Sequence, residues 1–276
     1  IKNKWEHYLK FYLQQIKKII LIWDFKLIKS KLISKHKYIS HGFFNKLGGY
    51  SNGIYRSLNC GIGSKDKKKN IYKNLKKVCK KIRCAKNKLV LLKQIHSNKV
   101  FSINKIPINK PTGDAMITSK KKFALGILTA DCAPIFIFDP KIKTIAAIHV
   151  GWKGAYKKII YKTIIKLKKK GSNIHDLIAV IGPCISKNQY EVKKDFLKKF
   201  TIQNKKNINF FNFSKNKIFF SLNEYIENQL SDIGVKNVEI INKDTYSRKN
   251  NFFSHRRSLR NKENDYGRNI SVIMIK

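Results

Sequence analysis

The chain has 276 residues, of which 42% are hydrophobic, and its 60 Lys and Arg residues outnumber 16 Asp and Glu residues, giving a formal net charge of +44. This length allows one large domain with a sizeable core or two smaller domains, and the apolar content excludes a mainly disordered chain. No apolar run has the length of a transmembrane helix, so we expect a soluble protein without a membrane partner.

Residues 1–34 form a Lys- and Ile-rich, partly amphipathic stretch that has no small-residue cleavage site after a continuous apolar region. We interpret this stretch as an N-terminal extension of unknown role. From residue 35 to residue 276, no internal repeat and no linker divides the chain. We therefore predict a single domain of the α/β class (α+β), in which helices pack on a mixed β-sheet.

Apolar residues repeat with helical or strand spacing through most of this domain, and glycine and proline mark the turns. In chain order, the predicted elements are a glycine-rich loop over 41–63, a helix over 66–82 that Asp66 caps, a strand over 89–92, two buried strands within 123–150, a helix of about 17 residues that ends at Gly171, a strand over 177–181, a helix from about 188, a loop region over 202–216, a helix over 222–233, and strands over 238–241 and 270–275.

The segment 123–154 contains two apolar runs on either side of the turn 139–141, where Pro140 ends the first run. Both runs are short and rich in Ile, Phe, Ala and Val, which predicts buried strands. Burying Cys132 and His149 in such strands is costly unless they are paired, hydrogen-bonded or bound to a metal. If the two runs pair across the turn, these side chains lie next to each other.

A third residue with metal-binding chemistry, His96, follows the strand over 89–92. Two imidazoles and one thiolate suit zinc in tetrahedral geometry, and three protein ligands leave one position open, as in a catalytic site. Copper(I) is also compatible with these donors. The alternative for each histidine is an ordinary core residue with a hydrogen-bond partner, and the wide spacing of the three residues leaves this alternative open.

The same residues allow a second interpretation, in which Cys132 is a nucleophile that His149 or His96 activates. It competes with metal binding, because one thiolate does not serve both roles at once. Asp131 is a candidate to orient an imidazole or to act as a general base. Because neighbours along a strand face opposite sides, Asp131 can equally point away from Cys132.

Several other residues are suited to bind a polar or anionic substrate. Arginine holds phosphate or carboxylate through paired hydrogen bonds, although in so basic a chain a surface basic pair is an equal alternative. The candidates for anion binding are Arg256 and Arg257, with Lys46, Lys153 and Arg56 as weaker ones, and the candidates for hydrogen bonding are Asn59 and Gln94.

The positive charge and the cysteines bear on partners and compartment. Lysine is spread along the whole chain and no RNA- or DNA-binding motif accompanies it, which favours a compositional bias over a specific nucleic-acid partner. The five cysteines include no C-x-x-C pair and no spacing typical of a disulfide-rich scaffold. A reducing, cytoplasmic location fits this pattern best.

Several segments resemble the YfiH or laccase-domain family, whose members are also called multicopper polyphenol oxidases, peptidoglycan editing factors or purine nucleoside phosphorylase-like proteins. The matching segments are HGFFNKLGGYSNGIYRSLNCGIG, LLKQIHSNKV, GDAMITSKKKFALGILTADCAPIFIFDP, AAIHVGWKG, IGPCISKNQYEV, TYSRKNNFFSHRR and the late YGRN. They run in the family's order from about residue 40 to the end of the sequence. TADC followed by HxGWxG is highly specific.

The resemblance implies a layered α/β domain and a zinc site formed by His96, Cys132 and His149. It also implies that adenosine, inosine, guanosine or methylthioadenosine reacts with phosphate to give the base and ribose 1-phosphate, with adenosine deamination as a second reaction. Purine nucleosides and phosphate are then the partners, and we expect a monomer or a homodimer. The family usually has arginine where Lys46 and Lys153 stand, and lysine keeps the charge but loses the paired hydrogen bonds.

Three other functions stay open at this stage. A copper-dependent polyphenol oxidase needs many histidines for a multicopper centre, and the chain has seven. A hydrolase that edits peptidoglycan precursors would use Cys132 as its nucleophile. The non-enzymatic alternative is a basic nucleic-acid-binding protein with a structural metal, whose affinity would fall with salt.

Overall fold

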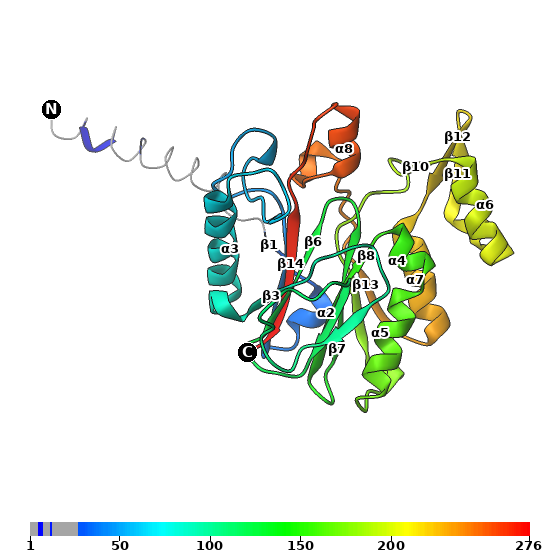
Figure 1. The fold of residues 1–276 in the computed structure, drawn as a ribbon, viewed down its shortest axis with the longest axis horizontal. Helices are drawn as coiled ribbons and strands as arrows, with labels where there is room; N and C mark the ends of the chain where they lie inside the picture. The colour runs from blue at the N-terminus through cyan, green and yellow to red at the C-terminus, as the bar shows by residue number, and fades with distance from the viewer. Residues whose placement is uncertain (1–4, 8–11, 13–26) are drawn as a thin grey trace.

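The computed structural model describes residues 5–7, 12 and 27–276, and Figure 1 shows their arrangement. The strands form a five-stranded, a six-stranded and a three-stranded sheet. The predicted α/β class is therefore confirmed, although the strands form three sheets instead of one. No helix in this part of the chain is both long enough and apolar enough to cross a bilayer. Most of the predicted N-terminal extension lies outside the described residues.

The five-stranded sheet has the strand order β1, β2, β14, β6, β3. These strands are β1 (Leu27–Ile28), β2 (Ile39–Phe44), β14 (Asn269–Ile275), β6 (Ala124–Thr129) and β3 (Leu89–Leu91). All neighbours are antiparallel except β3 and β6, which are parallel. The last strand of the chain thus lies in the middle of this sheet, where all of its residues are buried.

The six-stranded sheet has the order β13, β9, β7, β8, β5, β4. These strands are β13 (Asn237–Ile240), β9 (Ile178–Ile181), β7 (Ala133–Asp139), β8 (Thr144–Val150), β5 (Ala115–Thr118) and β4 (Val100–Ser102). The predicted pairing across the turn 139–141 is confirmed, because β7 and β8 form an antiparallel hairpin. The first apolar run is not one strand, however. It divides between β6 and β7, which belong to different sheets.

The two large sheets pack face to face, and helices cover their outer faces (Figure 1). Alternate side chains of β7 show these layers: Phe136 and Phe138 lie in the core between the sheets, whereas Ile135 and Ile137 contact the helices. The covering helices are α3 (Lys68–Ile82) on the five-stranded sheet, and α4 (Trp152–Tyr156), α5 (Ile159–Lys168) and α7 (Leu222–Ile233) on the six-stranded sheet. Strands buried on both faces are continuously apolar, which explains the two apolar runs in the sequence.

A smaller unit, whose core is rich in aromatic residues, packs beside the six-stranded sheet. It consists of β10 (Glu191–Val192), α6 (Lys194–Gln203), η4 (Lys205–Phe210), β11 (Phe211–Ser214) and β12 (Lys217–Phe220). Phe196 and Phe200 of α6 stack with ring centroids 4.6 Å apart, and both contact Phe211 and Phe220 of the hairpin. The loop predicted over 202–216 is therefore wrong in part, because burial of these phenylalanines stabilises a hairpin there.

Three predicted helices differ from the structure. The helix that should end at Gly171 is two helices, α4 and α5, because Lys158 between them has left-handed backbone with φ of 58°. The helix predicted from about 188 begins at Lys194, after β10. Asp66 is not the N-cap of α3, a position that Lys67 occupies. Instead, the carboxylate of Asp66 accepts hydrogen bonds from Ser51 and Asn59 and holds the preceding loop.

Residues 27–34, which we assigned to the N-terminal extension, are joined to both large sheets. Strand β1 pairs with β2, and α2 (Lys31–Ser34) follows it. Glu239 of β13 accepts hydrogen bonds from the Ser30 hydroxyl and from two main-chain N–H groups in the first turn of α2. The remaining elements are η1 (Gly53–Tyr55), η2 (Lys86–Lys88), η3 (Ile174–Asp176), η5 (Arg248–Asn250) and α8 (His255–Arg260).

Candidate metal centre

Three side chains from distant parts of the sequence converge at one end of the sheets. The potential ligand atoms of His96, Cys132 and His149 all lie within 4.8 Å of one another. Sγ of Cys132 is 3.7 Å from Nε2 of His96, and the two imidazole ring centroids are 4.8 Å apart. Within residues 5–7, 12 and 27–276, no other group of three or more His, Cys, Asp and Glu side chains is placed to hold a metal ion.

Each of these residues stands at or near the end of a strand. Cys132 follows Asp131 in the turn between β6 and β7, and Asp131 has left-handed backbone with φ of 82°. His149 is the last residue but one of β8, opposite Pro134. His96 lies in the loop that leaves β3, also with left-handed backbone, at φ of 57°. That conformation costs a residue other than glycine about 1 kcal/mol, so other contacts must hold the loop.

Asp114, directly before β5, supplies those contacts. Its carboxylate accepts hydrogen bonds from the main-chain N–H groups of His96 and Ser97, at 3.0 and 2.6 Å, and from the Ser97 hydroxyl. It also accepts from Nδ1 of His149 at 2.8 Å. One fully buried carboxylate therefore orients two of the three candidate ligands. Although burial opposes ionisation, these hydrogen bonds lower the pKa of Asp114 to about 2.

The ionisation of the cluster suits metal binding. Burial alone would raise the pKa of Cys132, but the imidazoles of His149 and His96 outweigh it and lower the pKa to about 6. In turn, burial would lower the pKa of His149, but the Cys132 thiolate and Asp114 raise it to about 9. Without a metal, the neutral-pH state is thus a thiolate beside an imidazolium. A metal cation that displaces the imidazolium proton therefore finds the Cys132 thiol already deprotonated.

The donor set and its spacing fit zinc. Ordinary Zn–S and Zn–N bonds in a tetrahedral site separate sulfur and nitrogen by roughly 3.6 Å, and the Cys132–His96 separation is 3.7 Å. Because Nδ1 of His149 is bonded to Asp114, its Nε2 is the nitrogen left for a metal. Copper(I) accepts the same donors. Three ligands would hold either ion and leave one coordination position for substrate or water.

Gly151 makes room for this arrangement. A Cβ atom at this position would lie 2.8 Å from Sγ of Cys132 and 2.8 Å from Cδ2 of His96. Such distances are shorter than van der Waals contact, so any other residue would displace a ligand. The glycine of the GWKG segment is therefore required by the close packing of the ligands, and not by a special backbone conformation.

Asp131 faces away from the three ligands. Its carboxylate accepts hydrogen bonds from the Thr245 hydroxyl at 2.7 Å, the Ser254 hydroxyl at 3.0 Å and the main-chain N–H of Arg256 at 2.6 Å. These contacts attach the C-terminal loop to the turn that carries Cys132. Both carboxylate oxygens are thus bonded to this loop, which favours a positioning role toward Cys132, and the acid or base role that we considered from the sequence stays a prediction.

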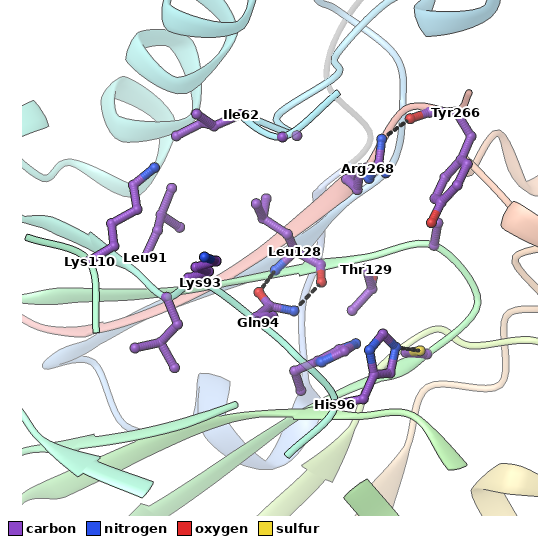
Figure 2. A pocket seen from close by; sticks show the side chains of 16 residues that line it. Ile62, Leu91, Lys93, Gln94, His96, Lys110, Leu128, Thr129, Tyr266 and Arg268 are labelled. Carbon is purple, nitrogen blue, oxygen red and sulfur yellow. Dashed lines mark hydrogen bonds between the residues drawn. The ribbon is translucent and has the colours of Figure 1, made fainter. Parts of the chain in front are cut away.

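A cavity of about 510 Å³ opens over the three ligands (Figure 2). Apolar side chains such as Leu91 and Leu128 form part of its wall, and a few polar groups converge on it. A cavity of this size holds a small organic ligand. Its cationic lining residues, among those that the structure describes, are Lys93, Lys110 and Arg268.

Among the substrate-binding residues predicted from the sequence, only Gln94 lines this cavity. Its amide is already bonded to the main chain of Leu128, accepting at 2.9 Å and donating at 2.7 Å, so it joins the two strands. Asn59 is fully buried and uses its amide to hold Ser64, Asp66, Gly61 and Arg268. Both residues therefore position the walls of the cavity.

The predicted cations lie elsewhere. The guanidinium of Arg257 donates to the carbonyl oxygens of Thr245, Tyr246 and Phe252, which commits it to the C-terminal loop. Arg256 lies over the ring of Tyr190, and Lys153 lies over Trp152. Lys46 is partly buried, and burial together with the nearby charges of Arg257, Arg248 and Arg56 lowers its pKa.

Sequence reasoning missed Asp114, Tyr266 and Arg268. Asp114 stands in the segment GDAM directly before a strand, and Arg268 stands in YGRN, so both lie in family motifs but in no pattern of their own. The Arg268 guanidinium lies 3.9 Å from the Tyr266 ring centroid and is paired with Asp265 at 3.1 Å. The ring of His255 packs against the same tyrosine, with centroids 4.7 Å apart.

The fold agrees with comparisons with known proteins. Residues 40–276 match the family described as multi-copper polyphenol oxidoreductase laccase. The chain belongs to this family. The predicted resemblance is thereby confirmed.

Named relatives and solved structures extend this result. Purine nucleoside phosphorylase from Rickettsia conorii is 35% identical over 68% of this chain and 78% of the relative, and that from Rickettsia prowazekii is 30% identical over 87% and 98%. Crystal structures of Bacillus licheniformis YfiH and Neisseria meningitidis NMB0706 each align with a TM-score of 0.81 at 26% identity. They cover 88% and 91% of this chain, and 95% and 99% of their own chains.

Proposed function

We propose that the chain is a zinc-dependent purine nucleoside phosphorylase, which converts adenosine, inosine, guanosine or methylthioadenosine and phosphate to the base and ribose 1-phosphate. The observation that carries the proposal is the cluster of His96, Cys132 and His149 on the wall of a cavity of suitable size. The names of the two Rickettsia relatives support the reaction. Adenosine deamination is proposed as a second reaction of the same cavity.

The chain's own residues supply the positioning that phosphorolysis requires. Zinc held by the three ligands would act as a Lewis acid at one end of the cavity. Arg268 lies over that end, beside Tyr266 (Figure 2), and is the best placed cation for inorganic phosphate. The Tyr266 hydroxyl has no hydrogen-bond partner among the described residues, so it is available to a substrate.

The test combines metal analysis with turnover. Purified protein should contain zinc near one equivalent and should release adenine from adenosine only when phosphate is present. Cys132→Ala should lose the zinc and both activities. Cys184→Ala, which changes a buried cysteine outside the cluster, should keep them. Phosphorolysis by metal-free protein would refute the zinc-dependent reaction.

A copper polyphenol oxidase is the rival that the family's description suggests. A multicopper centre needs additional groups of histidines, and in the described part of the chain only His96 and His149 belong to a metal-binding cluster. His41, for example, accepts a hydrogen bond from Ser30, and the His36 ring packs on Phe138. The histidine positions therefore favour the phosphorylase, and oxidation of a phenol by copper-loaded protein would reverse this choice.

A cysteine hydrolase is the second candidate that an observation favours. The low pKa of Cys132 and its contact with His149 resemble an activated nucleophile when no metal is bound. A peptidoglycan-precursor hydrolase would keep its activity in the presence of a chelator, whereas the phosphorylase would lose it.

All five cysteines are free thiols, which supports the proposed cytoplasmic location.

A further inference from the structure

The cavity at the metal centre has cationic side chains at two separate positions. Arg268 lies beside Tyr266 on one side, whereas Lys93 and Lys110 lie on the other side, near Leu91 (Figure 2). No Asp or Glu is among the described residues that line the cavity. An inorganic phosphate at Arg268 therefore leaves the side of Lys93 and Lys110 without an anion.

Main-chain hydrogen bonds hold these two lysines on the same wall. The N–H of Lys93 donates to the carbonyl of Pro111 at 3.0 Å, and the N–H of Gly113 donates to the carbonyl of Lys93 at 3.1 Å. The end of the loop that carries Lys110 is thus attached to the strand end that carries Lys93. Neither ammonium group has a hydrogen-bond or ion-pair partner among the residues that the structure describes.

A third lysine adds to the positive charge on this side. Lys68, at the first position of α3, donates to the carbonyl of Ile62, which lines the cavity. Burial and the nearby charge of Lys68 lower the pKa of Lys110. Like charges held this close repel each other, and a bound anion would remove that repulsion.

The space continues beyond the lysines. A second hollow of about 240 Å³ adjoins the cavity and shares Ile62, Leu91 and Lys110 with it. Its other walls include Tyr72 and Lys86, whose ammonium lies 5.1 Å from the centre of the Tyr72 ring. This hollow also has no Asp or Glu among its described lining residues. The two spaces together exceed what a nucleoside and one phosphate ion fill.

We infer that the cavity accepts purine nucleotides, with a 5′-phosphate or 5′-diphosphate bound between Lys93 and Lys110. The inference rests on the proposed function, in which Arg268 binds inorganic phosphate, so that C1′ of the ribose, which the phosphate attacks, lies beside Arg268. The 5′ carbon is bonded to C4′, across the ring oxygen from C1′, so with C1′ beside Arg268 a 5′-phosphate can extend into the part of the cavity that Lys93 and Lys110 line. Ammonium groups without protein partners form strong, charge-assisted hydrogen bonds to phosphate oxygens.

Equilibrium binding tests the inference without requiring turnover. Isothermal titration calorimetry on the full chain, as purified, should show ADP and AMP binding more tightly than adenosine, and adenosine should compete with both. Lys110→Met should weaken ADP binding by about tenfold, the loss expected for one charged hydrogen bond. The affinity of Lys110→Met for adenosine should stay within about twofold of that of wild type, because adenosine has no phosphate group that Lys110 could bind.

Lys105→Met is the matched control for the overall charge of the protein. Lys105 is exposed on the same loop, as Lys110 is, but lines neither space. Both variants reduce the formal charge of +44 by one, so general attraction of a polyanion would fall equally in both. Equal losses of ADP affinity in Lys110→Met and Lys105→Met would overturn the inference, and so would ADP binding to wild type that is no tighter than adenosine binding.

The outcomes for the two proposals are distinguishable. If ADP binding depends on Lys110 but no nucleoside is phosphorolysed, the nucleotide site stands and the phosphorylase proposal fails. If phosphorolysis occurs and Lys110→Met leaves ADP binding unchanged, only the nucleotide site fails.

Discussion

The carboxylate of Asp114 is shared between Nδ1 of His149 and the main chain at His96. One buried group thus sets the ring orientation of one candidate ligand and the backbone of another. Ligands oriented in this way bind metal more tightly, because less freedom is lost on binding.

Asp114→Asn should therefore weaken zinc binding by about 10- to 100-fold, because an amide neither holds the positive charge nor orients His149 as well. Competition with a chromophoric chelator measures the affinity. Asp139→Asn is a matched control, since Asp139 is also fully buried but lies at the opposite end of β7. Equal zinc affinity in wild type and Asp114→Asn would show that the shared carboxylate has no role in metal binding.

Gly151→Ala should abolish tight zinc binding, since its Cβ would meet Cys132 and His96 at 2.8 Å. The overpacking should also cost about 1–3 kcal/mol of stability. Gly154→Ala, three residues along, would meet its nearest atom at 3.4 Å and should be tolerated. Zinc content after dialysis compares the two variants, and a Gly151→Ala protein that retains one equivalent of zinc would contradict the packing argument.

Cys132 should be the most reactive thiol of chelator-treated protein. Its pKa of about 6 makes it a thiolate at neutral pH, whereas burial raises the pKa of Cys184 to about 12. The rate of alkylation by iodoacetamide should rise with pH to a plateau, with a midpoint near pH 6. Added zinc should protect this residue. A midpoint near the ordinary thiol value would mean that the two imidazoles do not act on Cys132.

The three candidate metal ligands could be chosen from the sequence because histidine and cysteine are unusual within long apolar runs. Asp114 could not, since a single aspartate before a strand forms no pattern, and its role depends on the loop of His96 returning to it. The break between α4 and α5 at Lys158 could not be predicted either, because the lysines before and after it keep a helical spacing. The hairpin at 211–220 had a signal in the alternation of Phe211 and Phe213, which the surrounding Asn and Lys residues obscured.

The cations that line the cavity could not be chosen from the sequence, for a physical reason. In a chain with 60 Lys and Arg residues, a cation by itself says little about anion binding. Arg257 and Arg268 look alike in the sequence, yet the first donates to three carbonyl oxygens away from the cavity, whereas the second, although paired with Asp265, lines the cavity. Only the tertiary contacts distinguish a guanidinium that closes a loop from one that a ligand can reach.

His41 should make the stability of the fold depend on pH. It accepts the Ser30 N–H, and burial together with Lys29 lowers its pKa from 6.5 to about 4. Above pH 6.5 it is neutral in the folded and unfolded chains alike. Between pH 6.5 and 4 only the unfolded chain takes up the proton, so the free energy of unfolding falls as the pH falls, by roughly 3 kcal/mol in total.

Urea unfolding at several pH values measures this dependence. His41→Gln can accept the same N–H but does not titrate, so its free energy of unfolding should fall less than that of wild type across this window. Parallel curves for the two proteins would show that His41 takes up its proton equally in both states.

The three ligands do not belong to one sheet. His96 leaves the five-stranded sheet, His149 lies in the six-stranded sheet, and Cys132 stands where the chain crosses from one to the other. An ion bound here would link the five-stranded sheet to the six-stranded sheet. The free energy of metal binding would then stabilise the packing of the two sheets, so that loss of the ion would lower the stability of the fold together with the activity.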